Sequence, residues 1–221
     1  MQSRADTAVM TRTRCAALGL ALAMALGACS TTAPAMKAGA SKAPGAVAAV
    51  QSGAGGFQLT EKVRVPAAAR TDYDNAMRLV DAGQYAQGIT LLQKVTQKAP
   101  AAAAAHVDLG IAYGRSGDLD HAVASLKRAV EINPRQLVAY NELGMLYRRK
   151  GEFGAARDSY EKALGIFPGF HYARLNLAIL CDVYLADLSC AQENYAAYQR
   201  LVPDDAQVAA WLADLNARAG H

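Results

Sequence analysis

The sequence has 221 residues, 23 of them Lys or Arg and 19 Asp or Glu, so its formal net charge is +4. After residue 28 its largest basic cluster is RRK at 148–150, which is more typical of a solvated helix end than of a nucleic-acid surface. The strongly basic class of nucleic-acid-binding proteins is therefore excluded, and no nucleic-acid partner is expected.

The first 28 residues have the pattern of a signal peptide. Arg4, Arg12 and Arg14 form a positively charged lead, and the apolar run at 18–26 is too short to cross a bilayer core of about 30 Å. Removing residues 1–28 takes away three Arg and one Asp, which lowers the net charge from +4 to +2. The mature chain is then expected in an oxidising compartment.

The leader ends in LGAC at 26–29, an aliphatic residue and two small ones before a cysteine. This resembles a bacterial lipobox, and the resemblance implies diacylglyceryl transfer to the thiol of Cys29 and cleavage just before it. Ser30 in the next position favours the outer membrane over the inner one, by resemblance to Gram-negative lipoproteins. We expect a palmitate-bearing lipoprotein at the periplasmic face of the outer membrane. The alternatives are an ordinary secretory signal cut nearby and a retained anchor.

Residues 29–56 contain mainly Ala, Gly, Ser and Pro. Such a stretch cannot bury enough apolar surface to offset its ordering entropy, so we predict a flexible linker. The following FQLTEKVRV at 57–65 alternates apolar and polar residues, which predicts a strand within an extended arm over 57–68. No partner strand is evident in the sequence. The arm is expected either to lie against the following domain or to pair with another protein or a second copy, which would give a dimer.

From residue 69 the chain repeats with a period of 34 residues, because Pro100, Pro134 and Pro168 are evenly spaced and Pro203 follows after 35. The two central units share seven positions. They are Leu109, Gly110, Tyr113, Ala122, Leu126, Ala129 and Pro134 in one unit, and Leu143, Gly144, Tyr147, Ala156, Tyr160, Ala163 and Pro168 in the next. This pattern resembles the tetratricopeptide repeat.

The resemblance implies an all-α fold, a right-handed solenoid of about four helix-turn-helix repeats across residues 69–204. The repeats are residues 69–102, 103–136, 137–170 and 171–204, followed by a capping helix and tail at 205–221. Gly110 and Ala122 are small where the two helices of a unit approach closely, and proline ends each second helix because it cannot continue one. Each unit alone leaves an apolar face bare, so the units are expected to stack.

In the family, the first helices of successive units line a concave groove that takes up a peptide. Carrying these positions over gives the groove residues Tyr73, Met77, Val107, Ile111, Asn141, Met145, Arg148, Tyr172, Leu175 and Ile179. The same positions add Arg70, Val80, Asp81, Ala104, Gly114, Arg115, Val138, Arg149, Asp182 and Val183. Met, Ile, Leu and Tyr are typical of adaptable interfaces. The alternative is that several of these residues, Val107 and Ile111 above all, pack between helices.

Some chaperone-binding relatives hold a free C-terminus with a carboxylate clamp of Lys and Asn. Val107 and Ile111 occupy those positions in the second unit. We therefore do not expect this chain to recognise a free C-terminus, and expect instead an apolar or amphipathic segment of a protein.

The sequence gives no support to catalysis. Four histidines are scattered without an HExxH pattern, and no serine lies in a GxSxG setting. The glycines at 53–56 lack the Lys and Ser or Thr of a phosphate loop. We expect a non-enzyme with no catalytic residue, no metal and no cofactor.

Cys181 and Cys190 are the free thiols left once Cys15 is removed and Cys29 is acylated. A metal site would need two more ligands, with Asp182 and Asp187 nearby, and a redox centre more often uses C-x-x-C. In the repeat frame the two cysteines lie level across the last hairpin and flank a one-residue insertion. We therefore expect a disulfide, with metal and redox roles as alternatives.

These features together predict a membrane-anchored scaffold that binds a protein partner in the bacterial envelope. By resemblance to tetratricopeptide pilotins, its place would be in the assembly of a pilus, secretion or other envelope complex. The alternatives are a periplasmic scaffold for cell-wall enzymes or an energy-transducing complex, and a homo-oligomer formed through the 57–65 arm.

Overall fold

The computed structural model describes residues 49–53, 56–60 and 65–220. The predicted signal peptide, the lipidation site predicted at Cys29 and most of the predicted linker lie outside these residues. None of the described helices is long and apolar enough to cross a membrane.

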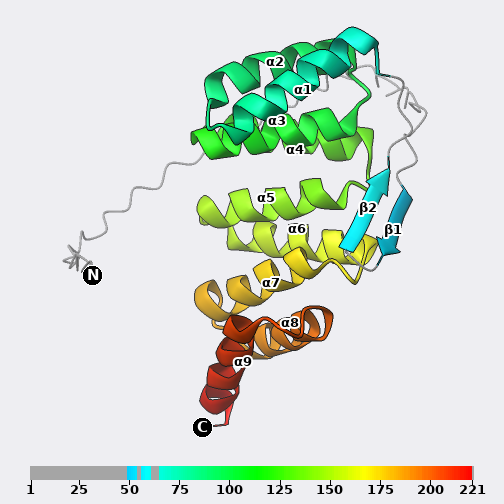
Figure 1. The fold of residues 1–221 in the computed structure, drawn as a ribbon. Helices are drawn as coiled ribbons and strands as arrows, with labels where there is room; N and C mark the ends of the chain where they lie inside the picture. The colour runs from blue at the N-terminus through cyan, green and yellow to red at the C-terminus, as the bar shows by residue number, and fades with distance from the viewer. Residues whose placement is uncertain (1–48, 54–55, 61–64, 221) are drawn as a thin grey trace, which may run out of the picture. The chain divides into compact units, whose positions relative to one another are not determined.

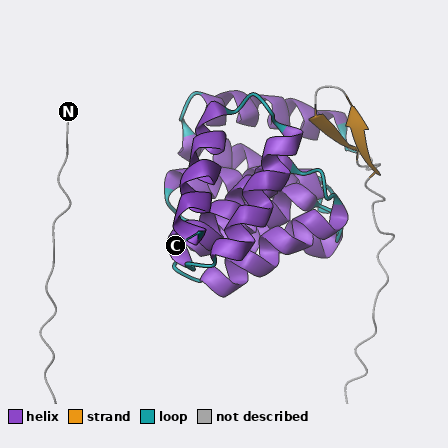
Figure 2. Cartoon of the chain, turned by 90° about the horizontal axis from the view of Figure 1, so that it is seen from below, coloured by secondary structure: helices purple, strands orange, loops and turns teal. Residues whose placement is uncertain are grey.

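Helices make up nearly all of the described chain (Figure 2). They follow one another as antiparallel hairpins, and α3, α5 and α7 also contact one another in turn (Figure 1). The nine described helices are α1 (Ala67–Asp81), α2 (Tyr85–Lys98), α3 (Ala103–Ser116), α4 (Leu119–Ile132), α5 (Leu137–Arg149), α6 (Phe153–Ile166), α7 (His171–Ile179), α8 (Leu188–Leu201) and α9 (Ala206–Ala219). The predicted all-α repeat fold is confirmed, with one hairpin in each predicted unit.

Glycine permits the tight turn inside each of the first three hairpins. Gly83, Gly117 and Gly151 recur 34 residues apart and have φ of 73°, 93° and 76°. An L side chain rarely adopts this left-handed conformation, so glycine is the residue that the turn favours.

A second set of glycines lets the two helices of a hairpin approach closely. A Cβ on Gly110 of α3 would lie 2.6 Å from Cγ of Leu126 in α4. A Cβ on Gly144 of α5 would lie 2.6 Å from Cδ1 of Tyr160, which is fully buried in α6. The Leu-Gly pair of each central unit is thus explained by packing, as the sequence predicted.

The fourth hairpin departs from the period. After α7 the chain forms a π-helical turn, η1 (Leu180–Tyr184), in which the amide of Leu185 donates to the carbonyl of Leu180 at 3.1 Å. A π-helical turn holds an additional residue without breaking the helix. The one-residue insertion expected in the loop is therefore taken up at the end of the first helix.

Helix α9 covers the apolar end of the stack, as predicted for a cap. Its Val208 and Leu215 are 1% and 0% exposed, and the side chain of Asp205 accepts hydrogen bonds from the amides of Gln207 and Val208 at its start. Trp211 on the same helix is 37% exposed. The last repeat is thereby closed on the C-terminal side.

One expectation for the N-terminal part was wrong. Strand β2 (Gly56–Thr60) pairs antiparallel with β1 (Ala49–Gly53), with Val50 opposite Leu59. The predicted strand therefore has a partner within the chain, inside the segment predicted as linker. Val65, at the end of the predicted arm, packs against a buried cluster of the first repeat that includes Val95 and Ala102.

Candidate binding groove

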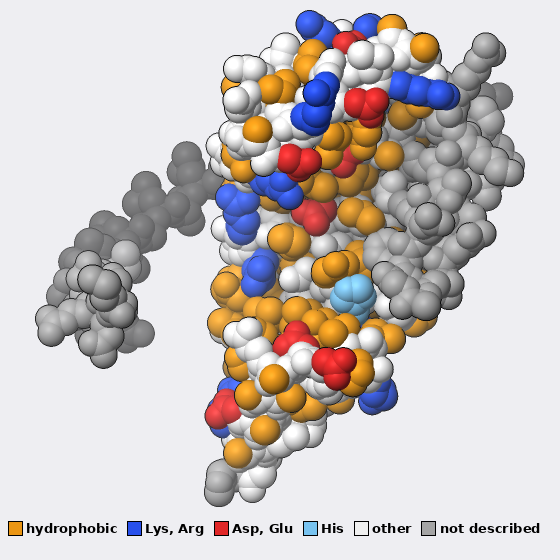
Figure 3. All heavy atoms as spheres, viewed as in Figure 1, with side chains coloured by type: hydrophobic (Ala, Val, Ile, Leu, Met, Phe, Trp, Pro, Cys, Tyr) orange, Lys and Arg blue, Asp and Glu red, His pale blue; other side chains and the backbone are white. Residues whose placement is uncertain are grey.

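The predicted groove residues come from α1, α3, α5 and α7, the first helices of the four hairpins, except Asp182 and Val183, which lie in η1. On the face drawn in Figure 3, hydrophobic side chains gather at the level of α5 and α7, and Lys and Arg side chains lie along one side of them. Tyr172 is 55% exposed, and most of the other predicted residues are partly buried. This second group is Tyr73, Met77, Ile111, Met145, Arg148, Leu175 and Ile179.

Four predicted groove residues are buried instead: Val80, Val107, Gly114 and Asn141. Val107 and Asn141 are each 5% exposed. Val107 packs in the core between the second and third hairpins, where Leu143 and Leu146 also lie. The assignment of Val107 to the groove was therefore wrong. Val107 packs between helices, which was the alternative.

Asn141 connects two repeats rather than facing a partner. Its side-chain oxygen accepts a hydrogen bond of 2.9 Å from Asn176, 35 residues later, so the bond joins α5 to α7. Tyr73 makes a similar link, because its hydroxyl donates to Asp108 on α3 at 2.6 Å. Burial, together with Asp108, raises the pKa of Tyr73. The groove assignment of Asn141 is therefore corrected to a contact between repeats.

Ile111 and Met145 line a hollow of about 260 Å³ between α3 and α5. Its other lining residues are Gly110, Gly114, Arg115, Leu126, Glu142, Leu146 and Arg149. Gly114 leaves the space open, since a Cβ there would come within 3.2 Å of Leu146. The hollow is large enough for an aliphatic side chain and combines an apolar floor with charged groups at its rim.

The charges at the rim are unevenly paired. Burial raises the pKa of Glu142, opposed by a hydrogen bond from Asn141 and by the charge of Arg115. Arg149 crosses between repeats, where its Nη1 donates to the carbonyl of Gly114 at 2.9 Å. Within the described chain, Arg115, Arg148 and Arg149 form no ion pair with a carboxylate.

The sequence predicted Asp182 and Val183 of η1 as groove positions but missed Tyr184. Val183 and Tyr184 are 66% and 44% exposed, and the guanidinium of Arg148 lies 5.7 Å from the centre of the Tyr184 ring. Phe153 contacts the same ring. Val183 was a predicted position, but the π-helical turn that also brings Tyr184 to Arg148 has no signal in the repeat pattern.

A second hollow of about 360 Å³ lies beside the first hairpin. Its lining is mainly apolar and includes Val65, Tyr73, Val95 and Ala105. Arg70 and Asp74 are its charged members. Tyr73 therefore lines this hollow and also bonds to Asp108. The alternation of apolar and polar residues at 57–65 was the sequence signal that could have placed Val65 against the repeats.

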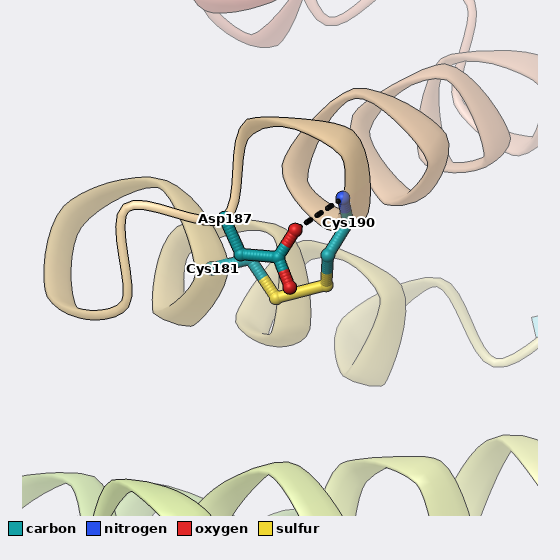
Figure 4. A group of neighbouring side chains, drawn as sticks. All are labelled: Cys181, Asp187 and Cys190. Carbon is teal, nitrogen blue, oxygen red and sulfur yellow. Dashed lines mark hydrogen bonds between the residues drawn. A yellow bond between two sulfur atoms is a disulfide. The ribbon is translucent and has the colours of Figure 1, made fainter.

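Cys181 and Cys190 form a disulfide, as predicted, with 5.9 Å between their Cα atoms (Figure 4). Asp187 lies beside them. Its Oδ1 accepts from the amide of Cys190 at 3.1 Å, and its Oδ2 pairs with Arg157 at 2.8 Å. Ligand atoms of the three residues lie within 4.8 Å of one another, but both sulfurs are bonded and neither is a thiolate. The group is a structural cross-link.

The described histidines have local structural contacts. His121 pairs with Asp118 at 2.8 Å and stacks on Tyr113. Burial lowers the pKa of His106 and of His171. They lie on three different helices, α4, α3 and α7, and none of them belongs to a group of three or more His, Cys, Asp or Glu side chains that could hold a metal among the described residues.

The tetratricopeptide repeat family model matches residues 73–137 and again residues 107–170. No curated protein matches the chain. Several solved structures do match it. One is MamA from Desulfovibrio magneticus RS-1, residues 41 to the end, which is 17% identical to this chain. The match covers 71% of this chain and 88% of that one, with a TM-score of 0.63. PilF of Pseudomonas aeruginosa is 19% identical over 69% of each chain, with a TM-score of 0.62.

A further match is TTC0263, a tetratricopeptide protein of Thermus thermophilus. It is 22% identical, with 66% of this chain and 80% of that one covered and a TM-score of 0.58. At such identities the likeness concerns the fold alone.

Proposed function

Because residues 73–170 match the tetratricopeptide repeat family model, we propose that the chain is a lipid-anchored scaffold of the bacterial envelope whose groove holds a segment of a protein partner. The family's role in protein–protein interaction supports the binding function. The observation that carries the proposal is the hollow between α3 and α5, where Ile111 and Met145 form an apolar floor on stacked first helices. An apolar or amphipathic segment placing one aliphatic side chain in this hollow would bury it from water.

The groove is tested by crosslinking pulldown from intact envelopes with Met145→Glu. A carboxylate in the apolar floor puts charge where an aliphatic side chain has to be buried, so capture of the specific partner should fall by at least about tenfold. Leu201→Glu is the matched control, since Leu201 is 46% exposed at the end of α8, away from the hollow. Equal capture by Met145→Glu and the unchanged protein, with both folded by circular dichroism, would contradict the groove assignment.

The lipid anchor is supported by the leader and by LGAC at 26–29. Metabolic labelling with an alkynyl palmitate analogue should label the chain, and Cys29→Ser should abolish the label. Cys15→Ser is the matched control, because Cys15 lies within the leader and should leave labelling unchanged. Retained label in Cys29→Ser would overturn the anchor.

The proposed setting is the assembly of a pilus, secretion or other envelope complex at the periplasmic face of the outer membrane. The resemblance of the sequence to tetratricopeptide pilotins supports this setting, and PilF shares the fold at low identity. A periplasmic scaffold for cell-wall enzymes or an energy-transducing complex is the second candidate. The identity of the crosslinked partner separates the two.

A homo-oligomer through the N-terminal strands is a third candidate. It rests on the β1–β2 hairpin, whose two strands form a sheet with no further strand in the described residues. Since an isolated two-stranded hairpin is marginally stable, a second copy could extend it. Light scattering of the full chain, which would report a dimer, tests this candidate.

A further inference from the structure

The rim of the α3–α5 hollow carries an excess of positive charge directed at one edge of the groove. Arg115, in the last turn of α3, and Arg149, in the last turn of α5, line the hollow, and Arg148 precedes Arg149 in the chain. The carboxylate of Glu142 offsets part of this charge from inside the hollow. An incoming ligand therefore meets apolar groups and a net positive rim together.

Cations at helix C-termini are common because they interact with exposed carbonyl groups. Lys150, next along the chain, has its charge balanced by carboxylates, since its ammonium pairs with Asp120 at 2.9 Å and with Glu152 at 3.5 Å. Arg115, Arg148 and Arg149 have no such carboxylate partner in the described chain. Their charge is thus left for a ligand, unlike that of Lys150.

Two of these arginines are held in place. Arg149 donates one N–H to the carbonyl of Gly114 on the neighbouring repeat, at 2.9 Å. Arg148 lies over the Tyr184 ring at 5.7 Å. A guanidinium group that stacks on a ring or donates one hydrogen bond still carries further N–H donors. These donors have a fixed fork geometry that suits a carboxylate.

On these grounds we infer that the groove selects an acidic partner segment, in which an aliphatic side chain fills the hollow and a neighbouring Asp or Glu engages the arginine rim. The inference rests on the proposed function and names the chemistry of the partner. It differs from the carboxylate clamp of the family, because the arginines lie at the ends of the first helices and the clamp positions hold Val107 and Ile111. A side-chain carboxylate within a segment, rather than a chain terminus, is the ligand.

The test is a bead-displayed library of random peptides selected on the purified full chain. Enriched peptides should carry Asp or Glu next to Leu, Ile, Val or Phe. The best of them is then labelled with fluorescein and titrated by fluorescence polarisation, beside a version with Asn or Gln in place of the acid. Binding of the acidic peptide should weaken as salt rises, whereas the amide version should respond little.

Arg115→Gln with Arg149→Gln should weaken the acidic peptide by at least about tenfold, since a hydrogen bond to a charged group is lost. It should leave the amide version nearly unchanged. Arg115→Gln alone is the second variant, because Arg115 makes no hydrogen bond to another described residue that its loss would remove. Arg200→Gln, on the exposed side of α8, is the matched control and should bind like the unchanged chain.

The outcomes separate this inference from the proposed function. Peptides that bind without acidic preference, yet are lost in Met145→Glu, keep the groove and overturn the acidic partner. Unchanged affinity in the arginine variants also overturns it. A library from which nothing is enriched overturns both.

Discussion

At the scale of single residues, Gly144 is the described glycine whose added Cβ would come nearest to a neighbouring side chain, that of Tyr160. Gly144→Ala places a Cβ 2.8 Å from Cζ of this fully buried ring, which cannot move without displacing its neighbours. We expect the free energy of unfolding to fall by about 1 to 3 kcal/mol, measured by urea denaturation.

The matched control for this substitution is Gly154→Ala. Gly154 lies on exposed α6 surface, where a Cβ would meet no atom within 4 Å. Alanine is the better helix former, so this change should raise the free energy of unfolding by about 0.5 to 1 kcal/mol. Equal effects at the two glycines would contradict the packing explanation.

Glu142 makes stability depend on pH. Burial raises its pKa, so the folded state binds the proton more tightly than the unfolded state. Its favourable contribution is complete below the unfolded pKa and is lost as pH rises through the folded pKa. Glu142→Gln should therefore unfold at a higher temperature than the unchanged chain at pH 7.

The gain from Glu142→Gln should shrink as pH falls below the usual value of 4.5, where both side chains are neutral. Thermal unfolding followed at several pH values measures this. Glu161→Gln, at an exposed position of α6, is the control and should show no such trend. A constant difference across pH would rule out titration of Glu142 as the cause.

The residues of the hairpin core could be predicted from the sequence, but the groove could be predicted only in part. The spacing of Gly110 and Gly144 from their partners repeats because the same close approach recurs in each unit. Val107 and Asn141 occupy groove positions in the repeat frame, yet their exposure depends on the neighbouring unit. The repeat frame gives the position of a residue along one helix but not how the next helix packs against it. The frame therefore placed Val107 and Asn141 in the groove, although both are buried.

At the scale of elements, the disulfide holds the irregular fourth hairpin. It joins η1 to the first turn of α8, nine residues apart in sequence. Removing it with Cys181→Ala and Cys190→Ala should lower the free energy of unfolding by about 2 to 3 kcal/mol by the chain-entropy estimate.

Hydrogen exchange measures where this loss acts, and it should increase in α8 and η1 before α3 and α4. A dithiol reductant should shift the thermal midpoint of the unchanged chain in the same direction and leave the double variant unaffected. A reductant effect of equal size in both proteins would contradict the assignment.

Some features of these elements could be predicted from the sequence and others could not. The cysteine pair could be predicted because the repeat frame set both residues level across a hairpin. Strand β1 could not, because AVQSG at 49–53 has a single strand-favouring residue, Val50, and the composition of a linker. Its pairing with β2 depends on a contact between segments rather than on local preference. The π-helical turn η1 likewise depends on how one added residue is accommodated.

At the scale of the whole molecule, the repeats form a chain of contacts between neighbours, and α9 contacts α8 at its end. Beyond burying Val208 and Leu215, α9 ties back to the fourth hairpin, because Arg218 pairs with Asp182 at 2.8 Å. Ending the chain after residue 203 removes this cover. Because two aliphatic side chains lose their burial, the free energy of unfolding should fall by about 3 to 5 kcal/mol.

In a stack stabilised by nearest neighbours, this loss should stay local. Hydrogen exchange of the shortened chain should rise in α7 and α8, whose Tyr195 is covered by α9 in the full chain, and change little in α3 and α4. Removing Gly220 and His221 alone is the control and should leave exchange unchanged. Loss of protection along all four hairpins at once would mean that the molecule unfolds as one cooperative unit, against the nearest-neighbour account.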